Sequence, residues 1–191
     1  MTRRPLLGCL FEIVETLALT LLIFLGIQTF VAQPYRVQQQ SMEQTLEPDQ
    51  YVLVDKLTPR FGAYERGDIV VFSPPESFPQ PDGAPLIKRV IGVAGDRVEI
   101  RDGRVWVNGE ALAEPYVYEG QPTSATAGRS DWTIPADEYF VMGDHRSSSA
   151  DSRVFGTVGA GAIVGRAWLR YWPLDVFGIL QPTRYDQAAA P

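Results

Sequence analysis

The chain has 191 residues, with 17 lysine or arginine against 23 aspartate or glutamate and a formal net charge of −6 at pH 7. This length suits one well-cored domain plus an appended segment, and an acidic chain lacks the basic surface that binds a nucleic-acid backbone. One cysteine, Cys9, excludes an intramolecular disulfide, and one histidine, His145, excludes a multi-histidine metal site. We therefore expect one folded unit without nucleic acid, metal or cofactor.

Residues 11–32 are predicted to form a transmembrane helix after a short cytoplasmic N-terminus, residues 1–10. The part from 17 to 32, LALTLLIFLGIQTFVA, carries no charge, and the 22 residues from Phe11 span roughly 33 Å as a helix. Arg3 and Arg4 precede this stretch, whereas mostly acidic residues follow it. This distribution favours a cytoplasmic N-terminus.

A cleavable signal peptide is the alternative interpretation of this stretch, with Ala32 at the cleavage site. Phe30, two residues before Ala32, is too bulky for the small-x-small cleavage pattern. Glu12 and Glu15 also interrupt the basic-to-apolar approach that a signal peptide requires. We therefore predict that the helix is retained as an anchor.

The catalytic domain is predicted at residues 33–180, after Pro34 breaks the helix, and a C-terminal tail at 181–191. Its composition is β-rich: seven short runs have the length and composition of strands, and turn residues separate them. Asp102-Gly103 favours a tight hairpin between two of them. Residues 73–85 and 119–131 are typical of exposed loops. The predicted strands cover residues 51–56, 68–73, 85–93, 96–101, 104–109, 138–143 and 162–172.

Ser41 lies nine residues beyond the apolar stretch, so any chemistry at this serine takes place close to the membrane. Ser41 and Gln44 also match a capping box, in which the serine hydroxyl only satisfies a free backbone amide. By itself the segment therefore leaves both a structural and a catalytic role open.

Lys88 lies in LIKRVIGVAGD, a run apolar enough to form a largely buried strand. Strand periodicity places Lys88 and Arg89 on opposite faces and does not decide which cation points inward. Chemistry separates the two: burial lowers a lysine pKa and yields a neutral amine that accepts a proton, whereas arginine stays protonated. A salt-bridged or snorkelling lysine remains the alternative.

A third segment, GDHRSSSADSR at residues 143–153, is dense in polar groups and follows an apolar strand. Such a segment is either a solvated loop or a buried hydrogen-bond network that orients a catalytic group. Asp151 and Arg153 are spaced to form an ion pair within it.

In this order, the segments resemble the conserved boxes of bacterial type I signal peptidases. QPYRVQQQSMEQTL is similar to the serine box of that family, GDIVVF at 67–72 to its conserved strand, KRVIGVAGD at 88–96 to its lysine box, and GDHRSSSADSR to its final box. The resemblance covers most of the chain, including the anchor. It implies a signal-peptidase-like, mostly β catalytic domain that rests an apolar surface on the outer face of the plasma membrane.

The resemblance also implies a mechanism. Ser41 is the nucleophile, its backbone amide donates to the oxyanion, and neutral Lys88 is the general base. Ser149 lies where the family has a serine that orients the lysine amine. Asp144, Arg146, Asp151 and Arg153 lie where the family has supporting ion pairs. The substrates implied are exported preproteins with a small-x-small cleavage site, bound in shallow apolar pockets beside membrane lipid.

At three positions the chain departs from the family pattern: Gln39 replaces a small residue, Gln44 a proline and His145 an asparagine. Gln39 either substitutes for a hydroxyl that donates to the oxyanion or misses that position. We expect Gln44 to change only the local backbone rigidity. His145 is either a neutral replacement for an amide or a second titrating group.

Two other functions stay open at this point. One is a Ser-His-Asp hydrolase that uses His145 with Asp144 or Asp151. The other is a membrane-tethered binding module that keeps the fold but has lost catalysis through Gln39 and Gln44.

Overall fold

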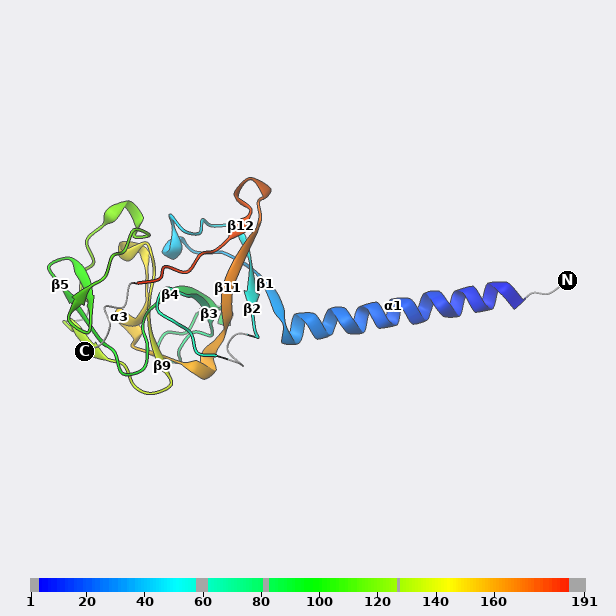
Figure 1. Ribbon diagram of the computed structural model, residues 1–191, viewed down its shortest axis with the longest axis horizontal. Helices are drawn as coiled ribbons and strands as arrows, with labels where there is room; N and C mark the ends of the chain where they lie inside the picture. The colour runs from blue at the N-terminus through cyan, green and yellow to red at the C-terminus, as the bar shows by residue number, and fades with distance from the viewer. Residues whose placement is uncertain (1–3, 58–61, 81–82, 127, 186–191) are drawn as a thin grey trace.

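The computed structural model describes residues 4–57, 62–80, 83–126 and 128–185. In this part of the chain, a long N-terminal helix projects from a β-rich body, as Figure 1 shows. The predicted fold class, a mostly β domain after one apolar helix, is confirmed. Residues 1–3, 81–82, 127 and 186–191 belong to the predicted N-terminus, two loops and tail, and lie outside the described residues, as do residues 58–61.

The N-terminal helix, α1 (Arg4–Phe30), begins earlier and ends slightly earlier than the stretch predicted from the apolar residues. Its part from Gly8 to Phe30 has 23 residues, a mean hydropathy of 2.2 and no buried residues, so it is long and apolar enough to cross a membrane. Directly after it, β1 (Ala32–Arg36) forms the edge of a sheet. Pro34 is tolerated there because an edge strand can lack a ladder donor.

The larger sheet is antiparallel and has eight strands in the order β1-β2-β11-β3-β4-β9-β10, with β12 also paired to β11. Its central strand β4 is buried almost along its whole length, so residues on both of its faces are shielded from water. The remaining strands of this sheet are β2 (Tyr51–Asp55), β3 (Ile69–Phe72), β4 (Leu86–Gly92), β9 (Glu138–Met142), β10 (Val158–Gly159), β11 (Ile163–Trp172) and β12 (Gly178–Ile179).

A smaller four-stranded sheet has the order β7-β6-β5-β8. Its strands are β5 (Arg97–Arg101), β6 (Arg104–Val107), β7 (Glu110–Ala111) and β8 (Asp131–Thr133). The predicted hairpin joins β5 and β6: Arg101 pairs with Arg104, and Asp102 and Gly103 have φ angles of 53° and 73°. These positive values are those of a type I′ turn, which explains the Asp-Gly pair.

Each of the seven predicted runs contains a strand, whereas β1, β7, β8, β10 and β12 were not predicted. Four of these five strands have only two or three residues, too few for a periodic pattern to appear in the sequence. Helical turns occupy several connections. Among the described residues they are α3 (Ser152–Phe155) and short 3₁₀ helices at Gln40–Met42, Tyr118–Gly120, Arg146–Ser148, Ala160–Ala162 and Leu174–Val176.

The chain after β12 packs against the domain at least as far as Tyr185, which differs from the prediction of a separate tail from residue 181. Tyr185 packs against a core cluster that contains Ile91 and Met142. Arg184 pairs with Glu65 at 2.7 Å. An aromatic ring and a charged pair therefore hold this segment to the body of the protein.

Close packing of β2 against β11 yields a stability prediction. A methyl group on Gly165 would overlap the Asp55 carbonyl oxygen and approach Val54 Cγ1 to 2.8 Å, whereas one on Gly161 meets nothing within 4 Å. Gly165→Ala is expected to lower the free energy of unfolding by about 1 to 3 kcal/mol, because overpacking forces the strands apart. Urea denaturation of the full chain in detergent measures the change. Gly161→Ala is the matched control, and an equal loss in both variants contradicts the prediction.

Candidate active site

The segment that carries Ser41 is a tight turn fastened to the core. Ser41 lies inside the 3₁₀ helix Gln40–Met42 and is 2% exposed. The neighbouring side chains of Met42 and Leu46 are fully buried and fix the turn on the domain. Because Gln39, not Ser41, is the N-terminal cap residue, the capping interpretation of Ser41 does not apply.

Strand β4 carries two consecutive buried cations, Lys88 and Arg89, which are 1% and 2% exposed. They point to opposite faces, as strand periodicity predicts. Both faces are covered, so burial does not single out one of them. Their partners differ instead: Lys88 meets a hydroxyl, whereas Arg89 meets a carboxylate.

The Lys88 amine lies 2.7 Å from Ser41 Oγ and donates to the Ile87 carbonyl oxygen at 3.0 Å. Burial lowers the pKa of Lys88 to about 8, against opposing effects of the Asp151 and Asp144 charges and with a smaller lowering by Arg153. A substantial fraction of the amine is therefore neutral near pH 8. A neutral amine beside a serine hydroxyl is chemically a general base beside a nucleophile.

Asp151 and Arg153 form the ion pair that their spacing predicts, with both side chains buried. Arg153 Nη2 and Nε each lie 2.8 Å from an oxygen of Asp151. Ser149 Oγ donates to Asp151 Oδ2 at 2.7 Å, and the backbone amide of Gly143 donates to the same oxygen at 3.0 Å. Ser149 thus binds the carboxylate in this structure, while the amine of Lys88 binds Ser41 and Ile87.

Asp144 and Arg146 are also buried, and each forms an ion pair with a residue outside the segment. Asp144 binds Arg89 in a bidentate pair, with N–O distances of 2.6 and 2.9 Å. Arg146 binds Glu114, with a shortest distance of 2.6 Å. The spacing of residues within the segment could not identify these partners, because each partner lies in a distant part of the sequence.

His145 contacts the turn of the nucleophile without reaching the Ser41 hydroxyl through its ring. Its Nδ1 lies 2.6 Å from Glu43 Oε2, and its ring stacks on Tyr118 with centroids 4.2 Å apart. Its backbone amide donates to the Ser41 carbonyl oxygen at 3.1 Å. Since Asp144 and Asp151 pair with arginines and Lys88 binds Ser41 Oγ, the geometry does not favour a Ser-His-Asp triad.

Gln44 has a φ angle of 79°, and its side chain ties the turn to the segment at residues 115–119. Its Nε2 donates to the Pro115 carbonyl oxygen at 3.1 Å, and its Oε1 accepts from the Glu119 amide at 3.0 Å. The expectation that Gln44 alters only backbone rigidity is therefore wrong, because its amide adds two hydrogen bonds.

Gln39 is exposed and its Nε2 donates to Gln80 Oε1 at 3.3 Å. It thus contacts the 73–85 loop rather than another residue of the serine segment. Beside Gln39 lies a cavity of about 180 Å³, lined partly by Tyr35, Val37, Val52, Val71 and Ile87. Ile87 precedes Lys88 on β4, so the cavity is adjacent to the Ser41–Lys88 pair.

Sequence reasoning missed several residues that position this cluster. Thr45 Oγ1 donates to Asp144 Oδ2 at 2.6 Å, and Glu114 neutralises Arg146. A side chain on Gly143 would overlap Ser149 and the Ser41 carbonyl oxygen. Gly143 follows the apolar strand directly, which is a usable signal for close backbone approach, whereas Glu114 lies in a loop without any signal.

The chain matches the family model described as signal peptidase, peptidase S26, over residues 10–172. It is 39% identical over 176 residues to "Signal peptidase I" of Leptolyngbya laminosa, an alignment that covers 91% of this chain and 85% of the relative. It is 32% identical over 182 residues to "Signal peptidase IB" of Staphylococcus aureus, covering 88% and 92%. A crystal structure of a signal peptidase I from Enterococcus faecalis is 31% identical, covers 55% of this chain and 96% of its own, and has a TM-score of 0.44.

The titration of Lys88 can be observed directly, because Lys56 and Lys88 are the only lysines in the sequence. With lysine labelled at ¹³Cε, NMR of the full chain in detergent should show one signal that titrates near pH 8, since burial lowers the pKa of Lys88 to about 8. Lys88→Arg assigns this signal by removing it. A Lys88 signal that titrates only above pH 10 contradicts the prediction.

Proposed function

The chain belongs to the signal peptidase family, peptidase S26, as a signal peptidase I, and on this premise we propose that it is a membrane-bound serine endopeptidase with a Ser41–Lys88 dyad. The observation that carries the dyad is the 2.7 Å contact between the buried Lys88 amine and Ser41 Oγ. Signal peptides are its substrates. We extend this to exported preproteins cleaved after a small-x-small sequence.

In the proposed acylation step, the Ser41 hydroxyl gives its proton to the neutral Lys88 amine, and Ser41 Oγ attacks the scissile carbonyl carbon. The tetrahedral intermediate collapses when the Lys88 ammonium returns the proton to the leaving amine, which releases the mature protein. An acyl ester of Ser41 remains. Lys88 then takes a proton from water, whose oxygen attacks the ester, and the Lys88 ammonium returns this proton to Ser41 Oγ as the ester C–O bond breaks. The signal peptide leaves with a carboxylic acid that loses its proton to solvent.

The negative charge of the intermediate requires hydrogen-bond donors near Ser41. We propose the Ser41 backbone amide as one donor. Gln39 precedes it by two residues and now donates to Gln80, so its amide serves as a second donor after it leaves this partner. The Gln39–Gln80 hydrogen bond is long, at 3.3 Å, and exposed, so breaking it costs little free energy.

Two buried carboxylate–arginine pairs support the dyad in this proposal. Asp151 holds Arg153 and receives hydrogen bonds from Ser149 and Gly143. Asp144 holds Arg89 and the hydroxyl of Thr45, four residues after the nucleophile. Each carboxylate charge is largely neutralised, so that burial dominates the pKa of Lys88.

The cavity beside Gln39 is suited to one small side chain of the cleavage site. Its lining is mainly apolar, its volume is about 180 Å³, and Ile87 places it next to Lys88. The size of side chain that this pocket accepts depends on the space left by lining residues such as Ile87. We propose that it receives the small residue at the outer of the two recognised positions, two residues before the one whose carbonyl is cleaved.

We propose that α1 spans the plasma membrane once, with its N-terminus in the cytoplasm and the catalytic domain outside. The apolar length of Gly8–Phe30 supports the span, and Arg3 and Arg4 support the orientation. Four large apolar side chains around the β11–β12 connection are exposed, which supports contact with lipid. They are Trp172, Leu174, Phe177 and Ile179, with exposed fractions from 51% to 70%.

Substitution of each candidate base separates the dyad from a triad. Ser41→Ala and Lys88→Met are expected to reduce cleavage of a preprotein at least 1,000-fold, on the order of losses seen when a nucleophile or its base is removed. His145→Ala is expected to keep cleavage within roughly tenfold, because its ring binds Glu43. Cleavage by folded, detergent-solubilised variants is followed by gel.

The contrary outcomes are distinct. Loss of cleavage in folded His145→Ala together with full cleavage in Lys88→Met favours the triad. Equal, background-level cleavage by wild type and Ser41→Ala leaves the binding module as the function.

Enlarging the cavity should relax specificity at the outer recognised position. Ile87→Ala is expected to raise the kcat/KM for a leucine substrate, relative to the matching alanine substrate, by tenfold or more, because the removed atoms leave room for the longer side chain. Val164→Ala, which lies outside the cavity lining, is the control. An unchanged leucine-to-alanine ratio in Ile87→Ala shows that this cavity does not receive that side chain.

A further inference from the structure

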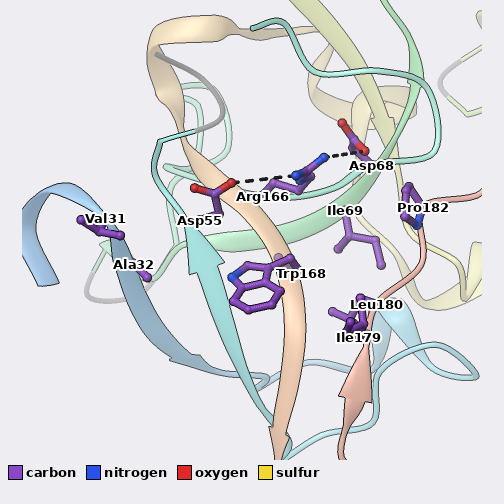
Figure 2. Close-up of a pocket in the computed structure, with 11 residues that line it drawn as sticks. Val31, Ala32, Asp55, Asp68, Ile69, Arg166, Trp168, Ile179, Leu180 and Pro182 are labelled. Carbon is purple, nitrogen blue, oxygen red and sulfur yellow. Dashed lines mark ion pairs between the residues drawn. The ribbon is translucent and has the colours of Figure 1, made fainter. Parts of the chain in front are cut away.

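The segment that follows β12, described as far as Tyr185, contacts residues next to the polar network of the active site. Figure 2 shows Leu180 and Pro182 on this segment, along the wall of a second cavity. Farther along, the backbone of Thr183 lies directly over Gly67, where any side chain would overlap the Thr183 carbonyl. Arg184 then pairs with Glu65 at 2.7 Å and with Asp68 at 3.5 Å.

Two residues of this segment reach Arg89, Thr183 directly and Tyr185 through Tyr116. The Nη1 of Arg89 donates to the Gly67 carbonyl oxygen at 3.1 Å and to Thr183 Oγ1 at 3.4 Å. Its guanidinium also lies 3.9 Å from the ring centroid of Tyr116. The hydroxyl of Tyr116 in turn contacts the hydroxyl of Tyr185 and binds Glu114 at 2.9 Å. Thr183 therefore borders one side of the guanidinium, and Tyr185 holds the ring that covers it.

Arg89 transmits this arrangement to the nucleophile and the base. Its bidentate pair fixes Asp144, which also holds Thr45 in the turn of Ser41. The next residue, His145, donates its backbone amide to the Ser41 carbonyl oxygen at 3.1 Å. Arg89 is also the immediate neighbour of Lys88 on β4, so a shift of its guanidinium affects both members of the dyad.

We propose that Thr183–Tyr185 form a C-terminal strap whose positioning residues hold Arg89 on Asp144. The strap thereby keeps the Lys88 amine at hydrogen-bond distance from Ser41 Oγ. This inference rests on the proposed dyad and assigns it a support that the conserved boxes do not contain. The strap touches neither the nucleophile nor the base. It acts on them through the guanidinium of Arg89.

A loosened strap should change the pKa of Lys88, because this pKa depends on the charges around the amine. Asp151 and Asp144 raise the pKa of Lys88, whereas burial and Arg153 lower it. When Arg89 moves away, the charge of Asp144 is less neutralised and stabilises the Lys88 ammonium more strongly. The acid limb of kcat/KM then moves to higher pH, a change that loss of folded enzyme alone does not produce, because unfolded molecules contribute no cleavage.

A pair of glycine substitutions tests the strap in the full chain. Gly67 and Gly109 have similar φ angles, 91° and 86°, but a methyl group at Gly67 would displace Thr183, whereas one at Gly109 meets nothing within 4 Å. Gly67→Ala is expected to lower kcat at least tenfold relative to Gly109→Ala, with little change in KM, and to move the acid limb upward by about 0.5 pH unit or more. Kinetics on a soluble peptide substrate and thermal unfolding are measured for both.

Tyr185→Phe provides a second variant in case Gly67→Ala does not fold. It removes only the hydroxyl that contacts Tyr116, and we expect a smaller loss of kcat, about threefold, with the limb displaced in the same direction. Tyr171→Phe, on the distant β11, is its control. The strap is refuted if folded Gly67→Ala or Tyr185→Phe keeps the wild-type pH profile. Failure of the dyad itself appears differently, as cleavage that survives Ser41→Ala.

Discussion

The rest of the active site depends on the burial of one amine beside one hydroxyl. An ammonium group removed from water is strongly disfavoured unless an opposite charge compensates it. Lys88 is 1% exposed and binds an uncharged hydroxyl and an uncharged carbonyl oxygen. Burial therefore shifts the equilibrium toward the neutral amine, and the pairing of Asp144 and Asp151 with arginines limits the opposing effect of their charges.

Strand β4 shows how this is achieved with two neighbouring cations. Arginine stays charged when buried and forms two parallel hydrogen bonds with a carboxylate, whereas lysine releases its proton more readily. Arg89 is the partner of Asp144, and Arg153 is the partner of Asp151. Exchanging the residues at 88 and 89 would leave Asp144 with a weaker partner and place a permanent charge beside Ser41.

Much of the fold could be predicted from the sequence, because its long strands are marked by local composition and Asp102-Gly103 by its backbone preference. The pairing of Ser41 with Lys88 depended on the resemblance, since each residue has a common structural role when considered alone. The partners of Asp144 and Arg146 could not be predicted. Arg89 and Glu114 reach them through tertiary structure, and no spacing rule connects positions so far apart.

The same limit explains why the departures from the family pattern were hard to judge. Gln44 has a positive φ angle, which proline cannot adopt, so a proline at this position would require a different backbone in the turn after Ser41. Its amide binds the 115–119 segment, where Tyr118 also stacks on His145, and His145 pairs with Glu43. These side-chain contacts hold the turn that carries Ser41, a role that the rigid ring of a proline at position 44 would otherwise fill. Gln44 and His145 are thus better understood together, as parts of one clamp on Ser41, than as two separate substitutions.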